Sequence, residues 1–169
     1  MLKQRGYTLL ELAFILFLTF LFVFIAIPSW KEWLISIETD KKIRQLISAI
    51  HYARTEAIKR NRIIAICPSS DGNHCTSNWN QGYLIFVSEH TQFISEKNKL
   101  RFYPAFPSSG TLRWHRKTLF YIRTNGFLGI KNGRFSYCPA NADPRFAKEI
   151  IISVTGRVRI SSELTQACS

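Results

Sequence analysis

The chain has 169 residues, enough for about one domain with an appended segment and too few for several large domains. Its hydrophobic content of 46% is ordinary, but Lys and Arg outnumber Asp and Glu by 23 to 11, which gives a formal net charge of +12 and a pI near 9.9. This imbalance suits a polyanionic partner. The sequence has no internal repeat and no low-complexity segment, which argues against repeat arrays and linker-like chains.

An apolar run occupies residues 7–27 and is interrupted only by Thr8, Glu11 and Thr19. A membrane helix needs about 20 apolar residues at about 1.5 Å each, so we expect a membrane span over residues 7–28. Glu11 is costly there, because an acidic residue at the centre of such a helix is about 2.5–3.5 kcal/mol uphill and needs a partner. A secretory signal peptide and a plain single-pass anchor are the alternatives, and neither explains Glu11.

Beyond Pro28, apolar residues recur at three- and four-residue steps from Trp30 to Ala57. This spacing predicts an amphipathic helix over residues 29–61 with one buried stripe. We therefore expect the N-terminal helix to continue into the globular part.

From Arg62 onward the pattern changes to short segments rich in β-branched and aromatic residues, separated by Gly, Pro, Asn and Ser. The predicted strands cover residues 62–67, 82–87, 111–114, 118–122, 134–138, 149–154 and 157–160. Residues 62–169 are therefore expected to form a β-rich domain with antiparallel pairing. The polar stretch 88–99 is expected to be a mobile loop.

Four cysteines form an even set in a small domain, as expected in an oxidising compartment, and they allow three pairings. Sequence proximity favours Cys67 with Cys75, which leaves Cys138 with Cys168 to tie the C-terminus to the domain. A metal site is poorly supported, because the sequence has no CxxC pair and His74 has no second ligand cluster. We expect neither a metal nor another cofactor.

The segment KQRGYTLLEL at residues 3–12 resembles the class III signal of type IV pilins and pseudopilins. The resemblance implies that residues 1–6 are a leader, that prepilin peptidase cleaves between Gly6 and Tyr7, and that the new first residue is N-methylated. Phenylalanine is more common than tyrosine at that position. Glu11 then becomes the fifth mature residue, where the family keeps a glutamate. Its implied partner is the free amino group of a neighbouring subunit, which sets the register of filament assembly.

The segments WNQGYLIFV, FYIRTNGF, GRFSYC and EIIISVTGRVRI are similar to those of GspH/FimT minor pilins. This resemblance covers most of residues 7–160. It implies an α+β, type IV pilin-like fold, in which a long helix, half transmembrane and half amphipathic, packs on antiparallel sheet. It also implies contacts with other pilin subunits. The expected location is the inner membrane, with a periplasmic domain, before assembly into a pilus at the cell surface.

Within that family, FimT-like members bind DNA during natural transformation, and the GRxR spelling at residues 156–159 points toward them. In an extended tail, Arg157 and Arg159 point to one side, about 6–7 Å apart, a spacing comparable to that of successive phosphates on one DNA strand. We therefore predict contacts to the phosphates of double-stranded DNA, without sequence preference. The predicted DNA-binding residues are Gly156, Arg157, Arg159, Arg113, Arg116, Lys117, Arg123 and Arg134.

Two functional classes remain open. In the alternative to DNA binding, the chain is a structural minor pilin or type II secretion pseudopilin that primes filament assembly. Gly156 is then a turn glycine, and the tail arginines are surface charges on an edge strand. An enzyme is not supported, because the four histidines are scattered and no nucleophile lies in a recognisable elbow.

Overall fold

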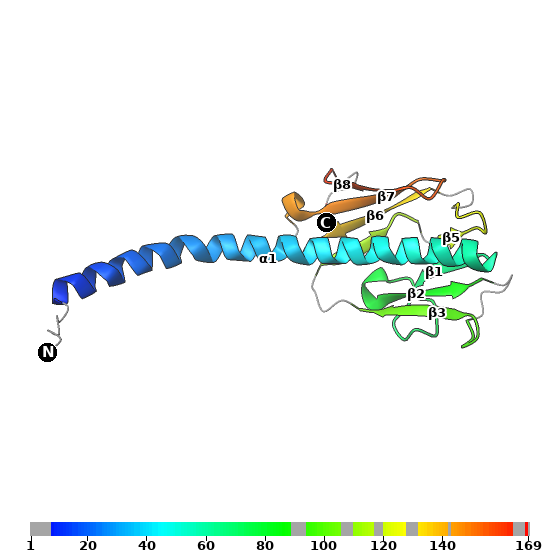
Figure 1. The fold of residues 1–169 in the computed structure, drawn as a ribbon, viewed down its shortest axis with the longest axis horizontal. Helices are drawn as coiled ribbons and strands as arrows, with labels where there is room; N and C mark the ends of the chain where they lie inside the picture. The colour runs from blue at the N-terminus through cyan, green and yellow to red at the C-terminus, as the bar shows by residue number, and fades with distance from the viewer. Residues whose placement is uncertain are drawn as a thin grey trace, which may run out of the picture. The chain divides into compact units, whose positions relative to one another are not determined.

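The fold is taken from a computed structural model (Figure 1). The structure describes residues 8–88, 94–105, 110–116, 120–127, 132–141, 143–163 and 168, apart from the side chains of residues 25–29 and 120. The chain divides into two units, Met1–Ile37 and Glu38–Ser169. The leader residue Gly6, the cleavage residue Tyr7 and residues 89–93 of the loop expected over residues 88–99 lie outside the described residues.

Helix α1 spans Leu9–Arg60, and its N-terminal part makes up the described portion of the first unit. Thr8 caps the helix, because its hydroxyl accepts a hydrogen bond from the backbone N–H of Glu11 at 3.3 Å. Large apolar side chains of this unit are exposed from Leu9 to Phe24. Within the described residues, no helical stretch combines the length and the apolarity that crossing a membrane requires. The membrane span expected over residues 7–28 stays a prediction.

In the second unit, α1 presents one buried stripe to the domain. The stripe consists of Ile43, Leu46, Ala49, Ile50, Ala53 and Ala57. The three alanines let the helix approach the strands closely. The predicted periodicity is present, but the stripe does not start at Trp30, which is 61% exposed. The helix ends where Asn61 adopts a positive φ of 51°, a common C-terminal cap.

The strands form two antiparallel sheets of four strands each. The first has the order β3-β2-β1-β5, and the second has the order β4-β6-β7-β8. The first sheet consists of β1 (Ile64–Pro68), β2 (Gly82–Val87), β3 (Lys99–Pro104) and β5 (Phe120–Ile122). The second consists of β4 (Thr111–Trp114), β6 (Gly133–Cys138), β7 (Lys148–Ile152) and β8 (Val158–Ser161). Two short 3-10 turns lie within the sheets' connections: η1 (Trp79–Gln81) between β1 and β2, and η2 (Pro144–Phe146) between β6 and β7.

Each predicted strand overlaps an observed one, and β3 was missed. Its sequence, KLRFYP, follows a charged stretch that we assigned to a loop. The expected fold class, a long helix packed on antiparallel sheet, is confirmed.

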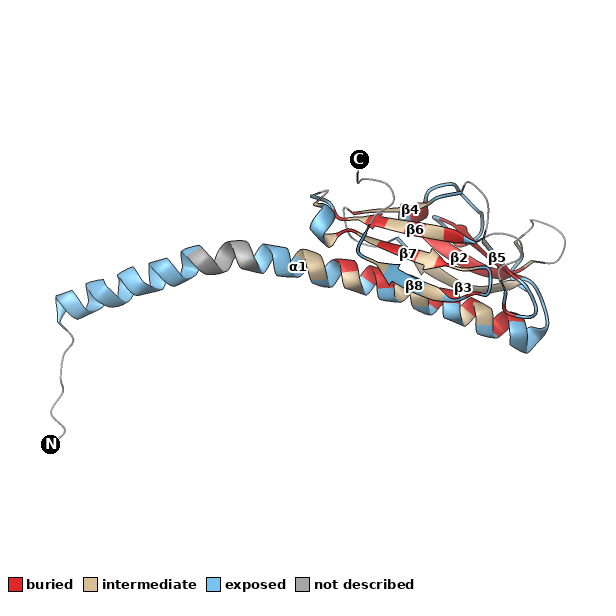
Figure 2. Cartoon of the chain, turned by 90° about the horizontal axis from the view of Figure 1, so that it is seen from above, coloured by how far each residue is buried: buried red, intermediate tan, exposed pale blue. Residues whose placement is uncertain are grey.

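One hydrophobic core joins the helix stripe to the inner faces of both sheets. In Figure 1 the C-terminal half of α1 runs across the strands, and Figure 2 shows its buried residues on the side that faces them. Phe135 of β6 lies near the centre, with its ring 4.8 Å from Trp79 and 4.4 Å from Trp114 between centroids. A smaller cluster around Cys67, Leu84 and Phe86 covers the other face of the first sheet.

The disulfides join the expected pairs. Cys67–Cys75 closes a short loop, in which the carboxylate of Asp71 accepts hydrogen bonds from the backbone N–H groups of Asn73 and His74. Asp71 also pairs with the His74 ring at 2.8 Å. This pairing, together with the two hydrogen bonds from the backbone, holds the pKa of Asp71 well below its usual range.

The second disulfide, Cys138–Cys168, links residues 30 apart in sequence. It ties the end of the chain to β6, which lies two strands away from β8 in the second sheet. The tail therefore leaves β8 at one edge and is anchored again further inside the same sheet.

Replacing Phe135 with Ala should lower the free energy of unfolding by about 3–5 kcal/mol, because it removes an aromatic side chain from the closed centre of the core. Urea unfolding followed by tryptophan fluorescence, with the disulfides intact, measures this change. The control is Ile160→Ala, at a position 54% exposed, which should cost less than about 0.5 kcal/mol. Equal losses in the two variants would contradict this description of the core.

Candidate nucleic-acid interface

Side chains of strand β6 alternate between the two faces of the second sheet. Along β6, Phe135 and Tyr137 are buried, whereas Arg134 and Ser136, which alternate with them, are half-buried. Successive residues of a strand point to opposite faces, so Arg134 and Ser136 lie on the outer face, away from the helix and core.

The strand register carries this outer face across the sheet. Arg113 of β4 is opposite Ser136, and Arg134 is opposite Ile151, which is in turn opposite Arg159 of β8. Arg157 precedes β8 and is separated from Arg159 by Val158, which packs against the core. We call these four residues, Arg113, Arg134, Arg157 and Arg159, the arginine face.

The spacing of the arginine face follows from sheet geometry. Arg134 and Arg159 lie two strands apart, about 9–10 Å across the sheet, while Arg157 and Arg159 lie about 6–7 Å apart along the chain. Arg113, Arg157 and Arg159 are exposed, and Arg134 is half-buried. Ile160 shares its face with the buried Ile150 but is itself exposed, because β8 is the edge strand.

One carboxylate, that of Glu149, interrupts this basic surface. The register places Glu149 beside Ser136, and its side chain is 1% exposed. It accepts a hydrogen bond from the Ser136 hydroxyl at 3.2 Å and lies 3.9 Å from the Arg134 guanidinium. Glu149 therefore offsets part of the charge of Arg134. Among the described residues, neither Arg157 nor Arg159 forms an ion pair with a carboxylate.

His115 connects Arg116 to this surface. The backbone N–H of Arg134 donates to His115 Nδ1 at 3.1 Å, and Arg116 Nε lies 2.9 Å from His115 Nε2. Partial burial, together with the positive charges of Arg116 and Arg134, lowers the pKa of His115. The two arginines lie on opposite sides of the ring, and their charges disfavour its protonation.

The GRxR glycine lies in the turn of residues 153–157 between β7 and β8. Gly156 has a φ of +78°, and its N–H donates to the Ser153 carbonyl at 2.9 Å. The backbone N–H of Arg157 donates to the Ser153 hydroxyl at 3.1 Å. A Cβ on Gly156 would lie 2.8 Å from the carbonyl oxygen of Gly126. Glycine is thus required by the turn and by a neighbouring turn, while its own N–H is already used inside the protein.

The neighbouring turn, residues 123–127, brings Arg123 to the same end of the domain. The N–H of Arg123 donates to the Phe127 carbonyl at 2.8 Å, and Gly126 donates back to the Arg123 carbonyl at 2.8 Å. Arg123 is exposed. The two turns meet at Gly126 and Gly156.

The predicted residues are therefore placed unequally. Arg113, Arg134 and Arg159 share one sheet face, with Arg157 and Arg116 beside it, and Arg123 lies in the adjoining turn. Lys117 lies outside the described residues. Sequence reasoning missed Arg54, a half-buried residue of α1 whose guanidinium donates to the carbonyl of Gly156 at 3.3 Å. Its position beside the alanine stripe gave no signal of this long-range contact.

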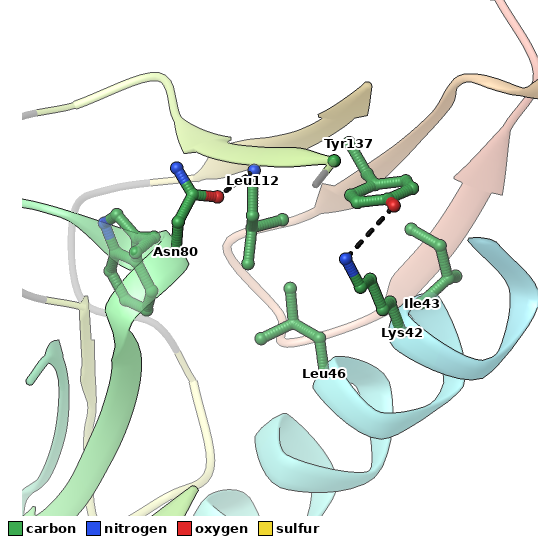
Figure 3. A pocket seen from close by; sticks show the side chains of 8 residues that line it. Lys42, Ile43, Leu46, Asn80, Leu112 and Tyr137 are labelled. Atoms are coloured by element: carbon green, nitrogen blue, oxygen red, sulfur yellow. Dashed lines mark hydrogen bonds between the residues drawn. The ribbon is translucent and has the colours of Figure 1, made fainter. Parts of the chain in front are cut away.

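A small cavity lies elsewhere in the domain and is lined by Lys42, Tyr137 and Leu112, among others (Figure 3). Its volume of about 20 Å³ is enough for roughly one water molecule. Lys42 Nζ donates to the Tyr137 hydroxyl at 3.1 Å, and burial lowers the pKa of Lys42. Within the described part of the chain, no group of three or more His, Cys, Asp or Glu residues could hold a metal ion.

The arrangement of a long helix on two antiparallel sheets is the fold of type IV minor pilins. Two crystal forms of the minor pilin FimU from Pseudomonas aeruginosa superpose on the chain with TM-scores of 0.65 and 0.59, at 23% and 24% sequence identity. They cover 78% and 75% of this chain and 96% of FimU in each case. The family model of the type II transport protein GspH matches residues 42–156, and the chain belongs to this family. No curated protein matches significantly.

The pKa of His115 should rise when a phosphate-rich ligand binds the neighbouring arginines, because the phosphates counteract the positive charges that disfavour protonation. Without ligand, imidazole signals in NMR spectra should titrate below the usual value of about 6.5. With duplex DNA they should titrate higher, and DNA affinity should increase as the pH falls through that range. His115→Gln removes this pH dependence if the histidine causes it. An unchanged His115 titration with DNA bound would place the ligand elsewhere.

Proposed function

We propose that this chain is a minor type IV pilin whose globular domain binds double-stranded DNA through the arginine face, and so supports DNA uptake in natural transformation. The observation that carries the proposal is the strand register, which gathers arginines from β4, β6 and the β8 tail on one face. In the described part of the chain, one buried carboxylate, that of Glu149, lies between them. Gly156 holds the turn, and Arg116 and Arg123 extend the basic surface.

The chemistry of such a surface favours phosphate contacts over base readout. The guanidinium group presents a planar set of donors that matches phosphate oxygens. The face is a sheet surface rather than a helix that could enter the major groove, so sequence-specific contacts have no obvious source. Release of counterions from DNA then supplies most of the binding free energy, and affinity depends steeply on salt.

We propose a filament role for the first unit. Its apolar side chains are exposed in the isolated chain, and Glu11 lies in the first helical turn. In a filament these side chains pack against other pilin subunits, and Glu11 pairs with a neighbour's amino terminus. Before assembly, prepilin peptidase cleaves after Gly6, and the helix is held in the inner membrane with the domain in the periplasm. The two disulfides support an oxidising compartment.

The second candidate is a pseudopilin or structural minor pilin that primes assembly without binding DNA. The name of the matching family, a type II transport protein, favours it. In that case the arginine face has no nucleic-acid partner, and its charges serve only to keep an edge strand from pairing with other chains. Both candidates are binding and assembly roles, and we propose no catalysis for either.

Replacing Arg157 and Arg159 with Gln should weaken duplex DNA binding by the full chain in detergent. The slope of log affinity against log salt should flatten by up to about 2, because each phosphate contact contributes about −0.9 on duplex DNA. Shuffling the DNA sequence should change affinity far less. Fluorescence anisotropy over a salt series measures all three quantities.

The control pair is Lys41→Gln with Lys97→Gln, two exposed lysines outside both the arginine face and the turns. Lys99 is unsuitable, because it donates to Asn73 and Glu96. Both pairs remove the same charge, so a long-range field alone would weaken binding equally. Equal losses of DNA affinity would show that the tail arginines act only as part of a diffuse basic surface. Unchanged affinity in both double variants would favour the priming role.

Glu11→Ala should leave processing at Gly6 intact but reduce incorporation into filaments, because the carboxylate that pairs with a neighbour's amino terminus is lost. Immunoblots of purified pili, compared with the membrane fraction, measure incorporation, and mass spectrometry of the mature N-terminus measures processing. Glu32→Ala is the control at an exposed position of the same helix. Wild-type levels of the Glu11 variant in pili would sink this role.

A further inference from the structure

Arg54 occupies the place where three separate parts of the chain meet. It projects from α1, the turn of residues 123–127 follows β5, and the turn of residues 153–157 joins β7 to β8. Its guanidinium donates to the Gly156 carbonyl at 3.3 Å. A Cβ built on Gly126 would lie 3.0 Å from Arg54 Nε, and a Cβ built on Gly156 would lie 3.3 Å from Arg54 Cζ.

Both turns depend on glycine for the same two reasons. Gly126 and Gly156 have φ values of +77° and +78°, which other residues adopt only with strain. A Cβ built on Gly156 would lie 2.8 Å from the backbone carbonyl oxygen of Gly126, and a Cβ built on Gly126 would lie 2.9 Å from Ile58 Cδ1, so a side chain at either position would have to displace a neighbour. The turns are therefore stacked on one another and on the Arg54 and Ile58 side chains of the helix.

The charge of Arg54 is not needed for an ion pair inside the domain. Among the described residues, its guanidinium donates to a backbone carbonyl, and no carboxylate forms an ion pair with it. The acidic residue nearest in sequence, Glu56, pairs with Arg60. A half-buried guanidinium that donates to a backbone carbonyl fixes the position of that carbonyl, because its donors are planar and the hydrogen bond is directional.

We propose that Arg54 is a positioning residue of the DNA site: it docks the Gly126 and Gly156 turns on helix α1 and thereby fixes the direction in which Arg157 and Arg123 point. The effect of Arg54 on DNA binding rests on the proposed function, whereas the docking of the two turns can be tested without DNA. It extends the site from the tail to the helix. It also explains why the glycine of the GRxR motif precedes the arginines, since only there does the chain reach Arg54 and Gly126.

Two variants of the full chain disrupt the docking in different ways. Arg54→Gln removes the guanidinium, whereas Gly126→Ala pushes a methyl group against Arg54 and Ile58 without changing any charge. Lys59→Gln is the control, because it removes the same charge as Arg54→Gln from an exposed position on the same helix. Hydrogen–deuterium exchange of peptides covering residues 153–161 reports the turn, and anisotropy over a salt series reports DNA binding.

We expect Arg54→Gln and Gly126→Ala to speed exchange in residues 153–161 and to weaken DNA binding by about tenfold, the loss of roughly one charge-assisted contact. In a chain that already carries Arg157→Gln, Arg54→Gln should lower DNA affinity by less than about a further twofold, because the residue that Arg54 positions is absent. Arg54→Lys should lie between wild type and Arg54→Gln. Lys59→Gln should leave exchange unchanged and act equally in both backgrounds.

Other outcomes overturn the inference in distinguishable ways. Unchanged exchange in both docking variants would show that Arg54 does not hold the turn. Full additivity with Arg157→Gln, with a salt slope flatter by about 0.9, would make Arg54 a direct phosphate contact instead. If the wild-type chain does not bind DNA at all, the proposed function fails, and the exchange data alone decide whether Arg54 docks the two turns.

Discussion

The burial of one side of the second sheet is the constraint on which the rest of the domain depends. Phe135, Tyr137, Ile150 and Ile152 must face the helix stripe, because each is removed almost completely from water. A strand has a side-chain period of two, so this requirement sends every intervening residue to the opposite face. The arginines are gathered by the same force that buries the isoleucines. A slip of one residue in the β6–β7 register would exchange the two sets.

Close backbone approaches then determine how the ends of these strands are held. Where α1, the turn after β5 and the turn before β8 converge, two glycines admit carbonyl oxygens and an arginine that a Cβ would displace. The Cys138–Cys168 bond fixes the other end of the tail to β6. Among the described residues β8 pairs with one strand, β7, and the chain on either side of it is restrained by the turn at Gly156 and by Cys168. This restraint keeps Arg159 on a defined surface instead of on a loose tail.

Some basic residues of the domain form ion pairs, and others lie together on one face of the second sheet. Several basic side chains form ion pairs with nearby acids, such as Arg60 with Glu56 and Arg145 with Asp143, and these pairs add no net charge. On the outer face of the second sheet, the buried Glu149 offsets part of one arginine and leaves the tail arginines unpaired with acids among the described residues. A surface of this kind binds a polyanion through its field and through short contacts together, which makes salt the natural variable for separating the two.

The sequence by itself determined the helix, most of the strands and both disulfide pairs, because these depend on local periodicity and on cysteine spacing. It also indicated the tail arginines, since Arg157 and Arg159 alternate within the strand predicted over residues 157–160. It could not locate β3, whose apolar residues follow a charged stretch, nor decide that the strands divide into two sheets. Only the tertiary structure placed Arg113 and Arg134 beside Arg159, and Arg54 under Gly156, because strand register and helix docking join residues that lie far apart along the chain.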